Sequence, residues 1–387
     1  MIVKKLHVKN FRNHADTEIE FGSGVNVLLG ENAQGKTNLL EAIFLTCVGR
    51  GWRTKKDADM IKFGEGRAQV RAVVNKKYGE VSVNVLLQDS VKVKSAGQGG
   101  AKKEIKVNDI PIGKMGELMG QVTSVFFSPD ELRLVKEAPA DRRRFMDIDI
   151  SQINKQYFYD LLRYNKILAQ RNALLKSVTE DIRTGLDIWD DQIAEYGARI
   201  IQGRISFLGE LVSGACDVHR GLSGGREILK LEYESFCPEV ACDLGIAGMG
   251  RDVEEIKTRL LAEYKKNRDR DMRLRTTTVG PHRDDIAIYL SDASCDVRRD
   301  ARSFASQGQQ RTIALSIKLA ELQLFKKKTG EMPILLLDDV FSELDSGRQA
   351  RLLEFSAGCQ TIITTNQFDM LKTLNVKVFT VSGGEVV

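Results

Sequence analysis

The residues from Gly30 to Thr37 read GENAQGKT, which fits the pattern GxxxxGK followed by Ser or Thr. The preceding GVNVLLG alternates like a strand, and the following TNLLEAIFLTCVG is apolar at helical spacing. In that order the glycines let backbone N–H groups face a phosphate, and the start of the helix adds its positive dipole end. A glycine turn with an incidental lysine is the alternative. The pattern predicts a site for a nucleoside triphosphate, lined by Gly30, Glu31, Asn32, Ala33, Gln34, Gly35, Lys36 and Thr37.

Lys36 would reach the β- and γ-phosphates of such a ligand, and Thr37 would bind Mg²⁺. A carboxylate for the same metal comes late in the chain, in PILLLDDVFSELD from Pro333 to Asp345. Its run of apolar residues is typical of a strand buried on both faces, and Asp338 falls at the carboxyl end of that strand. We predict that Asp338 holds Mg²⁺, directly or through water, and that Asp339 polarises the attacking water. A plain strand terminus is disfavoured, because buried paired aspartates without a cation are costly.

Two serine–glycine stretches could present a helix N-terminus to an anion. Ser306 to Gln309, SQGQ, precede a segment that is apolar nearly all round and that leads directly to the strand with the aspartates. Leu222 to Gly225, LSGG, are followed by alternating apolar residues, which are typical of a strand. We therefore predict that Ser306, Gly308 and Gln309 present N–H groups and a hydroxyl to an anion. Leu222–Gly225 is predicted to be a turn, with a phosphate role as the alternative.

Roughly 300 residues separate Lys36 from Asp338, which is far more than neighbouring strands of one compact domain need. The intervening segments 154–178, 186–220 and 253–275 have the pattern of amphipathic helices, and their heptads are too irregular for a long coiled coil. We predict an ATP-binding head formed by residues 1–128 and 280–387, interrupted by a mainly helical domain at 129–279.

The composition favours a reduced, cytoplasmic protein without a membrane span. The chain has 387 residues, 42% of them hydrophobic, and its six cysteines form no CxxC pair. No long apolar segment occurs. The net charge of +5 is mild, so the clustering of basic residues matters more. Such clusters are either solvated faces or contacts to a phosphate backbone, and the candidates for DNA contact are Arg53, Lys55, Lys56, Lys92, Lys94, Lys102 and Lys103.

Seven segments, which span nearly the whole chain in order, together resemble the RecF family of bacterial recombination mediators. GENAQGKT, SQGQQRT and LLLDDVFSELD alone are typical of the broader class of ABC-type and SMC-like ATPases. Four further segments make the resemblance specific: FSPDELRLVKEAPADRRRFMD at 127–147, YNKILAQRNALLK at 164–176, WDDQIAEYGARI at 189–200 and GPHRDDIAIYL at 280–290. The resemblance implies an α/β fold, namely a P-loop ABC/SMC-like ATPase head with mixed sheets and an inserted, mainly helical second domain.

The resemblance also assigns roles to residues of this sequence. Ser306, Gln307, Gly308 and Gln309 stand where the ABC signature stands, and the segment from Ser342 to Asp345 matches the D-loop. Arg12 and Asn13 resemble a basic strand end that touches nucleotide in SMC-like heads, although a solvated turn is equally open. In this class the signature of one subunit meets the γ-phosphate on the P-loop of another. ATP therefore holds two copies together as a homodimer, and hydrolysis releases them.

The function that this resemblance implies is that of a DNA-binding recombination mediator in DNA repair and replication. ATP and Mg²⁺ would be its cofactors, and DNA at single-strand gaps, RecO and RecR its partners, with RecA loading and SOS induction as outcomes. An ABC-type subunit that energises another complex and a small-molecule P-loop kinase are the alternatives. The segment TIITTN at 361–366 lacks the histidine that ABC proteins commonly place there, so we expect a slow, switch-like ATPase. GPHRDD at 280–285 would form a structural corner or approach the nucleotide.

Overall fold

The computed structural model describes residues 1–54, 56–89, 102–129, 133–177, 182–235, 252–366 and 376–387. Packing divides the chain into two compact units, Met1–Glu131 with Glu321–Val387, and Leu132–Ala320. In both units the apolar residues gather in a buried core. This division reflects packing alone, so the boundaries predicted for the ATP-binding head and the inserted domain stay predictions.

The first unit contains an antiparallel sheet whose strand order is β2-β1-β4-β5-β6-β7. Its central strands read as alternating apolar and polar residues, and in β1 the inward-facing side chains Val3, Leu6, Val8 and Phe11 are fully buried. The strands are β1 (Ile2–Phe11), β2 (His14–Glu20), β4 (Arg67–Lys76), β5 (Gly79–Gln88), β6 (Lys102–Val107) and β7 (Ile110–Pro111).

A second sheet of the first unit positions the predicted phosphate loop. Its order is β15-β14-β3-β13-β12-β8, and all neighbouring strands are parallel except β14 and β15. The residues of β8, β12 and β13 are buried throughout, as expected for a parallel sheet covered on both faces. The strands are β3 (Val25–Leu29), β8 (Ser124–Phe127), β12 (Ile334–Asp338), β13 (Thr361–Thr365), β14 (Lys377–Ser382) and β15 (Glu385–Val386).

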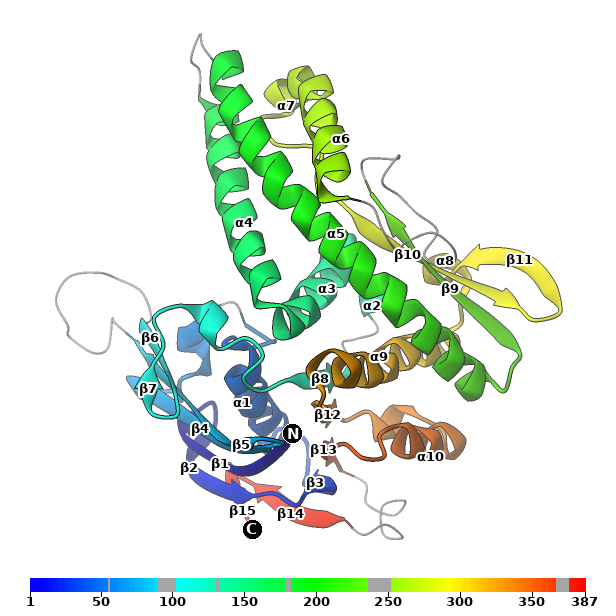
Figure 1. Cartoon of the computed structure of the whole chain (residues 1–387). Helices are drawn as coiled ribbons and strands as arrows, with labels where there is room; N and C mark the ends of the chain where they lie inside the picture. The colour runs from blue at the N-terminus through cyan, green and yellow to red at the C-terminus, as the bar shows by residue number, and fades with distance from the viewer. Residues whose placement is uncertain (55, 90–101, 130–132, 178–181, 236–251, 367–375) are drawn as a thin grey trace. The chain divides into compact units, whose positions relative to one another are not determined.

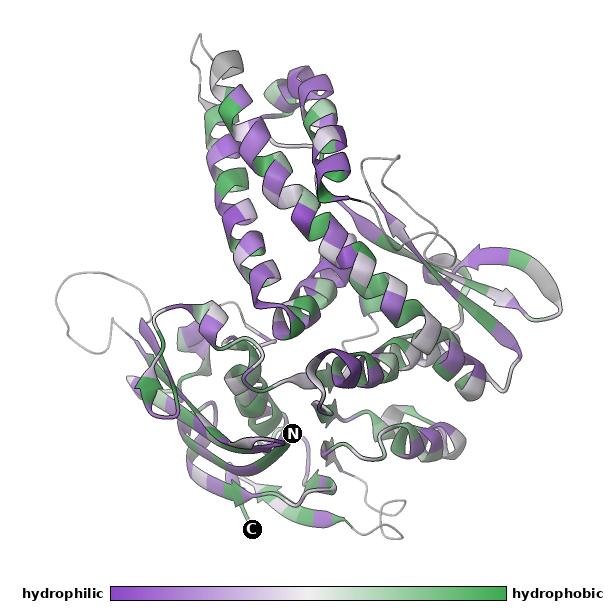
Figure 2. Ribbon diagram, in the orientation of Figure 1, coloured by the Kyte–Doolittle hydropathy of each residue, from purple (hydrophilic) through white to green (hydrophobic). Residues whose placement is uncertain are grey.

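The helices of the first unit follow these strands. Helix α1 (Lys36–Val48) begins at the end of the glycine loop after β3, and it is apolar along most of its length (Figures 1 and 2). Helix α10 (Ser346–Phe355) follows the short turn η4 (Phe341–Glu343) after β12. Two further turns, η1 (Asp57–Met60) and η2 (Met115–Glu117), lie in the connections of the antiparallel sheet. The carboxyl ends of β3, β12 and β13 therefore open on the same edge of the parallel sheet.

The second unit is mainly helical, and the three predicted helical segments are confirmed. They form α4 (Lys155–Lys176), α5 (Ile182–Ser223) and the pair α6 (Val253–Lys266) and α7 (Arg268–Leu274), which divides at Asn267. Figure 2 shows polar and apolar residues alternating along α4, α5 and α6, as expected for amphipathic helices. The other helices are α2 (Arg133–Lys136), α3 (Pro139–Ile153), α8 (Ala301–Phe304) and the start of α9 (Gln307–Thr329), which ends in the first unit.

A small antiparallel sheet of order β11-β10-β9 accompanies these helices, formed by β9 (Glu227–Glu234), β10 (Asp285–Asp292) and β11 (Cys295–Asp300). The predicted strand after the LSGG stretch is confirmed as β9. Leu222 and Ser223 are the last residues of α5, and Gly224 and Gly225 form a turn with φ values of +67° and +76°. The turn predicted for this stretch is confirmed there, since such φ values are those that glycine adopts at a helix end.

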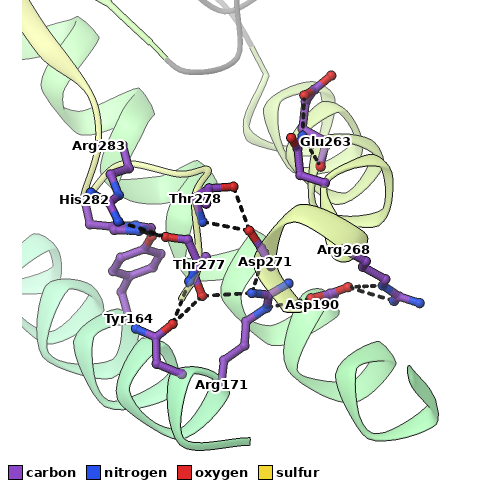
Figure 3. A network of polar contacts seen from close by, with 12 residues as sticks. Tyr164, Arg171, Asp190, Glu263, Arg268, Asp271, Thr277, Thr278, His282 and Arg283 are labelled. Carbon is purple, nitrogen blue, oxygen red and sulfur yellow. Dashed lines mark hydrogen bonds and ion pairs between the residues drawn. The ribbon is translucent and has the colours of Figure 1, made fainter. Parts of the chain in front are cut away.

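A buried ion network ties α4, α5 and α7 together (Figure 3). The Arg171 guanidinium donates to Asp190 Oδ1 over 2.8 Å, to Asp271 Oδ2 over 2.7 Å and to Thr277 Oγ1 over 2.8 Å. The side chains of Arg171, Asp190 and Asp271 are fully buried. The second carboxylate oxygen of Asp271 also has a donor, since Thr278 Oγ1 donates to Asp271 Oδ1 over 2.6 Å. The network fixes the loop that leads into GPHRDD.

GPHRDD itself forms a hydrogen-bonded corner within the second unit. His282 Nδ1 lies 2.6 Å from the hydroxyl of Tyr164, and His282 Nε2 lies 3.0 Å from the carbonyl oxygen of Thr277 (Figure 3). Burial lowers the pKa of His282 to about 4, so its neutral imidazole donates from Nε2 and accepts at Nδ1. Asp284 is buried and accepts from the hydroxyl of Tyr233 over 2.5 Å. These contacts support the structural-corner interpretation of GPHRDD.

Candidate nucleotide site

The glycine loop between β3 and α1 needs glycine at both ends. A Cβ on Gly30 would lie 2.3 Å from the carbonyl oxygen of Val381, so the backbone of β14 closes off this position. Gly35 has a φ of +113°, and a Cβ there would lie 2.6 Å from the side chain of Asn13 and 2.8 Å from that of His14. The loop can therefore pass close to these neighbours only without side chains at its two ends. The six residues from Gly30 to Gly35 bring the chain to the N-terminus of α1.

Lys36 is the first residue of α1, and its side chain folds back over the glycine loop. Lys36 Nζ donates to the carbonyl oxygens of Gly30, over 2.5 Å, and Glu31, over 2.8 Å. Burial lowers the pKa of Lys36, whereas the charges of Asp339, Asp338 and Glu31 raise it. A partly desolvated ammonium that donates to carbonyl oxygens, its partners among the described residues, is suited to bind a more strongly charged acceptor such as a phosphate.

Thr37, Asp338 and Thr364 meet at the carboxyl edge of the parallel sheet. Asp338 Oδ1 accepts hydrogen bonds from Thr37 Oγ1 over 2.6 Å and from Thr364 Oγ1 over 2.8 Å. Asp338 is buried, which raises its pKa, and the two hydroxyl groups lower that pKa. Hydroxyl and carboxylate oxygens are ligands that Mg²⁺ prefers. The Thr37–Asp338 pair therefore fits a magnesium site, although the two residues are 301 positions apart.

Asp339 follows the strand in a left-handed conformation, with a φ of 51°. Its backbone N–H donates to Thr364 Oγ1 over 2.9 Å and to the Thr364 carbonyl oxygen over 3.2 Å. Its side-chain Oδ1 is buried, and it has no hydrogen-bond partner among the residues that the structure describes. An acceptor oxygen left open in this way fits the polarisation of a water molecule. Thr364 is fully buried against both aspartates, so its hydroxyl orients them instead of pointing to solvent.

Arg12, Asn13 and His14 lie at the turn between β1 and β2, beside the glycine loop. Arg12 forms a bidentate pair with Glu41, with distances of 2.8 Å from Nε to Oε2 and 3.1 Å from Nη2 to Oε1. Asn13 Nδ2 donates to the carbonyl oxygen of Gln34 over 2.9 Å, which holds the loop from outside. Arg12 and Asn13, both predicted to bind ATP, thus make contacts that shape the loop and α1.

Sequence reasoning missed His14 and Glu41. His14 is fully buried, and its Nε2 lies 3.1 Å from the carbonyl oxygen of Gly35 while its Nδ1 lies 2.7 Å from that of Gly384. Burial lowers the pKa of His14, whereas the carbonyl oxygens of Gly35 and Gly384 raise it, and the neutral ring can donate to only one of the two at a time. Glu41 could have been found, because a lone carboxylate inside the apolar helix LLEAIF needs a cationic partner. Nothing local in the sequence points to Gly384 as a partner of His14.

A hollow of about 590 Å³ adjoins the turn at Arg12 and Asn13. It is lined by main- and side-chain atoms that include Arg12, Asn13, Asn38, Ile61, Lys62 and Phe63. The side chain of Phe63 is 99% exposed, and Lys62 Nζ donates to the carbonyl oxygen of Asn13 over 2.7 Å. The lining also holds the acidic residues Asp59, Glu65 and Asp89, so the feature of this hollow that suits a flat ring system is the exposed ring of Phe63.

The remaining residues of the predicted site fall into two groups. Asp345 caps α10 by accepting from the N–H of Arg348 over 3.0 Å, and Ser342 Oγ donates to the carbonyl oxygen of Asp339 over 2.8 Å. The D-loop residues thus lie in the first unit, next to Asp339. The signature residues Ser306, Gln307, Gly308 and Gln309 lie in the second unit, at and before the start of α9.

The residues predicted to contact DNA differ in their exposure and in whether their charged groups already have partners. Arg53 is exposed, and its Nη1 donates to Asn38 Oδ1 over 3.1 Å, close to the glycine loop. Lys56 and Lys102 are exposed, whereas Lys103 Nζ is held by Asp57 Oδ2 and the carbonyl oxygen of Gly49, each over 2.8 Å. Lys55, Lys92 and Lys94 lie outside the described residues. No helix in the described part of the chain combines the length and the apolar character needed to cross a membrane.

Comparison with known proteins gives consistent results over the whole chain. Residues 2–385 match the model of the RecF/RecN/SMC N terminal domain. The DNA replication and repair protein RecF of Ruminiclostridium cellulolyticum is 42% identical over 391 residues, covering 100% of this chain and 99% of that protein. The RecF protein of Streptococcus uberis is 39% identical over 388 residues, covering 99% of each.

Solved structures agree with these relatives. The structure titled recombination mediator protein RecF-ATPrS in the RecFOR pathway has a TM-score of 0.84 and 36% identity, covering 99% of this chain and 97% of that one. The corresponding RecF-ATP structure has a TM-score of 0.83 and 37% identity, covering 100% and 98%. An SMC head bound to the C-winged helix domain of ScpA has a TM-score of 0.57 at 16% identity, covering 100% of this chain and 97% of that one, so it bears on the fold alone. The predicted ABC/SMC-like ATPase head with its helical insertion is confirmed.

Proposed function

The chain belongs to the RecF family, and from this premise we propose how it works as an ATP-dependent recombination mediator in DNA replication and repair. Its fold is that of an ATPase head, and ATP is its nucleotide. We propose that Mg²⁺ assists, and that the protein acts in the cytoplasm on DNA next to single-strand gaps. RecO and RecR are the proposed partners, and RecA loading and SOS induction the proposed outcomes.

The observation that carries this proposal is the convergence of Lys36, Thr37, Asp338 and Asp339 at one edge of the parallel sheet. Lys36 would move its ammonium from loop carbonyl oxygens to the β- and γ-phosphates. Thr37 and Asp338 would hold Mg²⁺, which supplies positive charge to the phosphate oxygens during transfer. Asp339 would accept a proton from the water that attacks the γ-phosphorus, as the bond to the β-phosphate oxygen breaks.

The hollow beside Arg12 and Asn13 would receive the nucleoside part of ATP. Its volume of about 590 Å³ exceeds what a purine nucleoside needs, and Phe63 offers an exposed ring for stacking. The Arg12–Glu41 pair would keep the guanidinium at the wall of the hollow. Asn13 both lines this hollow and donates to the carbonyl oxygen of Gln34 in the glycine loop, so one ATP could contact both.

Hydrolysis would be slow and would act as a switch. Thr364, one of three residues of TIITTN (with Thr365 and Asn366) that could stand where ABC proteins commonly carry a histidine, is buried and already bonded to Asp338 and Asp339. It would therefore hold the two aspartates instead of sensing the γ-phosphate. The signature at Ser306–Gln309 would contact ATP bound to a second copy, so that ATP favours a homodimer and hydrolysis releases it. The dimer would bring two sets of exposed cations, at Arg53, Lys56 and Lys102, to the DNA backbone.

The test is the oligomeric state of the wild type and of Ser306→Arg, by sedimentation or light scattering, with ATP, with ADP and without nucleotide. We expect ATP alone to dimerise the wild type, and Ser306→Arg to stay monomeric while it still binds ATP in a filter assay. Ser206→Arg is the matched control, because Ser206 is an exposed serine of the same unit. A wild type that stays monomeric with ATP, as a small-molecule kinase would, contradicts the proposal.

A further inference from the structure

Glu227 connects the Leu222–Gly225 turn with the signature, two serine–glycine stretches that are far apart in the sequence. It is the first residue of β9 and comes two positions after the turn. Its Oε1 accepts a hydrogen bond from Gln309 Nε2 over 3.0 Å. The turn therefore places a carboxylate next to Gln309, the last residue of the signature.

Gln309 also makes the N-terminal cap of α9. Its side-chain Oε1 accepts from the N–H of Ser306 over 2.8 Å, and its own N–H donates to Ser306 Oγ over 3.3 Å. This reciprocal arrangement is a capping box. Because one amide group bonds both Ser306 and Glu227, the orientation of the cap depends on the carboxylate. The Ser306 oxygen serves as an acceptor in the cap, so its hydroxyl proton is left to donate to a ligand.

A buried histidine holds the other oxygen of Glu227. His219 Nε2 lies 3.1 Å from Glu227 Oε2, and His219 Nδ1 lies 3.2 Å from Ser316 Oγ. The Ser316 hydroxyl donates to the carbonyl oxygen of Thr312 over 2.6 Å, so its oxygen accepts from Nδ1. His219 therefore holds Glu227 through the carboxylate oxygen that does not face Gln309. This contact fixes the rotamer of Glu227.

Glu227 lines an open hollow together with the signature residues Ser306 and Gln309. The hollow has a volume of about 690 Å³, and its wall includes Ser306, Gln309, Arg226, Arg299 and Phe304. A carboxylate alone in it would repel a phosphate, but Arg226 and Arg299 in the same wall supply positive charge that offsets it. Because the Gln309 N–H is taken by Ser306 Oγ, the N–H groups of Gln307 and Gly308 are those in the first turn of α9 that can face an anion.

We propose that Glu227, held by His219, is a positioning residue of the signature. It orients the Gln309 amide so that the Ser306 hydroxyl and the first turn of α9 face the triphosphate bound to a second copy of the chain. This inference rests on the proposed role of Ser306–Gln309 in the dimer. Glu227 does not itself touch the nucleotide in this arrangement.

Glu227→Ala tests the assignment. We expect the P-loop of this variant to bind ATP as the wild type does, while ATP-dependent dimerisation weakens by about tenfold, because the cap loses the bond that orients it. Glu227→Gln keeps an acceptor for Gln309 and should lose less than Glu227→Ala. Glu234→Ala, on the same strand with an exposed carboxylate, is the matched control and should dimerise normally. Equal dimerisation of Glu227→Ala and the wild type overturns the proposal.

Mixing variants shows whether Glu227 acts through the signature. Lys36→Ala has an intact signature and a disabled P-loop, whereas Glu227→Ala would have the reverse. In an equal mixture half of the dimers are mixed, and each holds one complete site, so about a quarter of wild-type hydrolysis should return. Ser306→Arg mixed with Lys36→Ala is the reference for a signature defect. Recovery with Ser306→Arg but not with Glu227→Ala overturns the role of Glu227. No recovery in either mixture overturns the proposed signature, and the inference with it.

Discussion

Replacing Thr364 with valine would remove one hydroxyl group and leave the shape of the side chain almost unchanged. That hydroxyl donates to Asp338 Oδ1 over 2.8 Å and accepts from the N–H of Asp339 over 2.9 Å, in a fully buried place between β12 and β13. The Asp339 N–H still has the Thr364 carbonyl oxygen as an acceptor at 3.2 Å, so the free energy lost at Asp339 is small. Asp338 Oδ1 loses the hydroxyl of Thr364 and keeps that of Thr37. A hydrogen bond to a charged group contributes about 1.5–3 kcal/mol, and we expect Thr364→Val to lower the free energy of unfolding by about 2 kcal/mol near neutral pH.

The effect should depend on pH with a definite sign. Burial raises the pKa of Asp338, and the hydroxyl groups of Thr37 and Thr364 lower it, so the valine variant raises it further. A carboxyl group whose pKa is higher in the folded state binds its proton more tightly there. Its contribution to stability is therefore most favourable in acid and falls as the pH rises through the raised pKa. The destabilisation by valine should accordingly be smaller at about pH 4 than at about pH 7.

Urea unfolding of the nucleotide-free protein at these two pH values measures the difference. Thr364→Ser is the control, because serine keeps the hydroxyl and loses only a methyl group, which costs about 1 kcal/mol at both pH values. ATP hydrolysis by the valine variant should fall by at least about tenfold, since both aspartates lose the group that orients them. A valine variant that is as stable as the serine variant at neutral pH, or whose loss does not change with pH, would refute the reasoning.

Three further predictions follow from single contacts. Asp339→Asn should bind ATP and dimerise but release phosphate at least about 100-fold more slowly in a steady-state assay, and a normal rate would exclude Asp339 as the acceptor of the proton. Lys102→Ala should reduce the slope of log K, the DNA-binding constant, against log salt concentration by about one in magnitude. Lys103→Ala should leave that slope unchanged, because Asp57 already holds the Lys103 ammonium. Equal slopes for the two variants would contradict this prediction. Arg171→Met should cost about 3–5 kcal/mol in thermal unfolding, since it takes the cation from buried Asp271 and leaves buried Asp190 with Arg268 alone. A loss below about 1 kcal/mol would contradict the ion network.

The parts of the site that were predictable are those that depend on local spacing. The strand, glycine loop and helix around Lys36 and the buried strand that ends at Asp338 stand in the order that the pattern indicates. The amphipathic helices of the second unit are confirmed for the same reason, because their period of 3.6 is a local property. Thr37 and Asp338 were predicted to share one Mg²⁺ because both residue types suit that ion, whereas the hydrogen bond between them is a finding of the structure.

The unpredicted contacts join residues whose neighbours in sequence carry no sign of the partner. His14 meets Gly35 and Gly384 through backbone carbonyl oxygens, which every residue has, so no side-chain pattern identifies them. Glu227 meets Gln309 because the turn after α5 and the start of α9 come together, and neither segment specifies the other. Glu41 was the exception, since its isolated charge demanded a partner even though Arg12 could not be named.

The bonds from Gly383 and Gly384 to the glycine loop set the order in which the site can form during synthesis. His14 and Gly384 are 370 positions apart, and Gln34 accepts from the N–H groups of Gly383 and Gly384 over 2.6 Å and 3.1 Å. Strand β3 also lies between β13 and β14, which are translated long after it. A growing chain therefore carries the glycine loop for most of its time on the ribosome without the contacts that shape it. Chains that stall or are cut before these glycines would lack a shaped loop, so in the proposed ATP-dependent dimer the capacity to bind ATP would itself exclude incomplete copies.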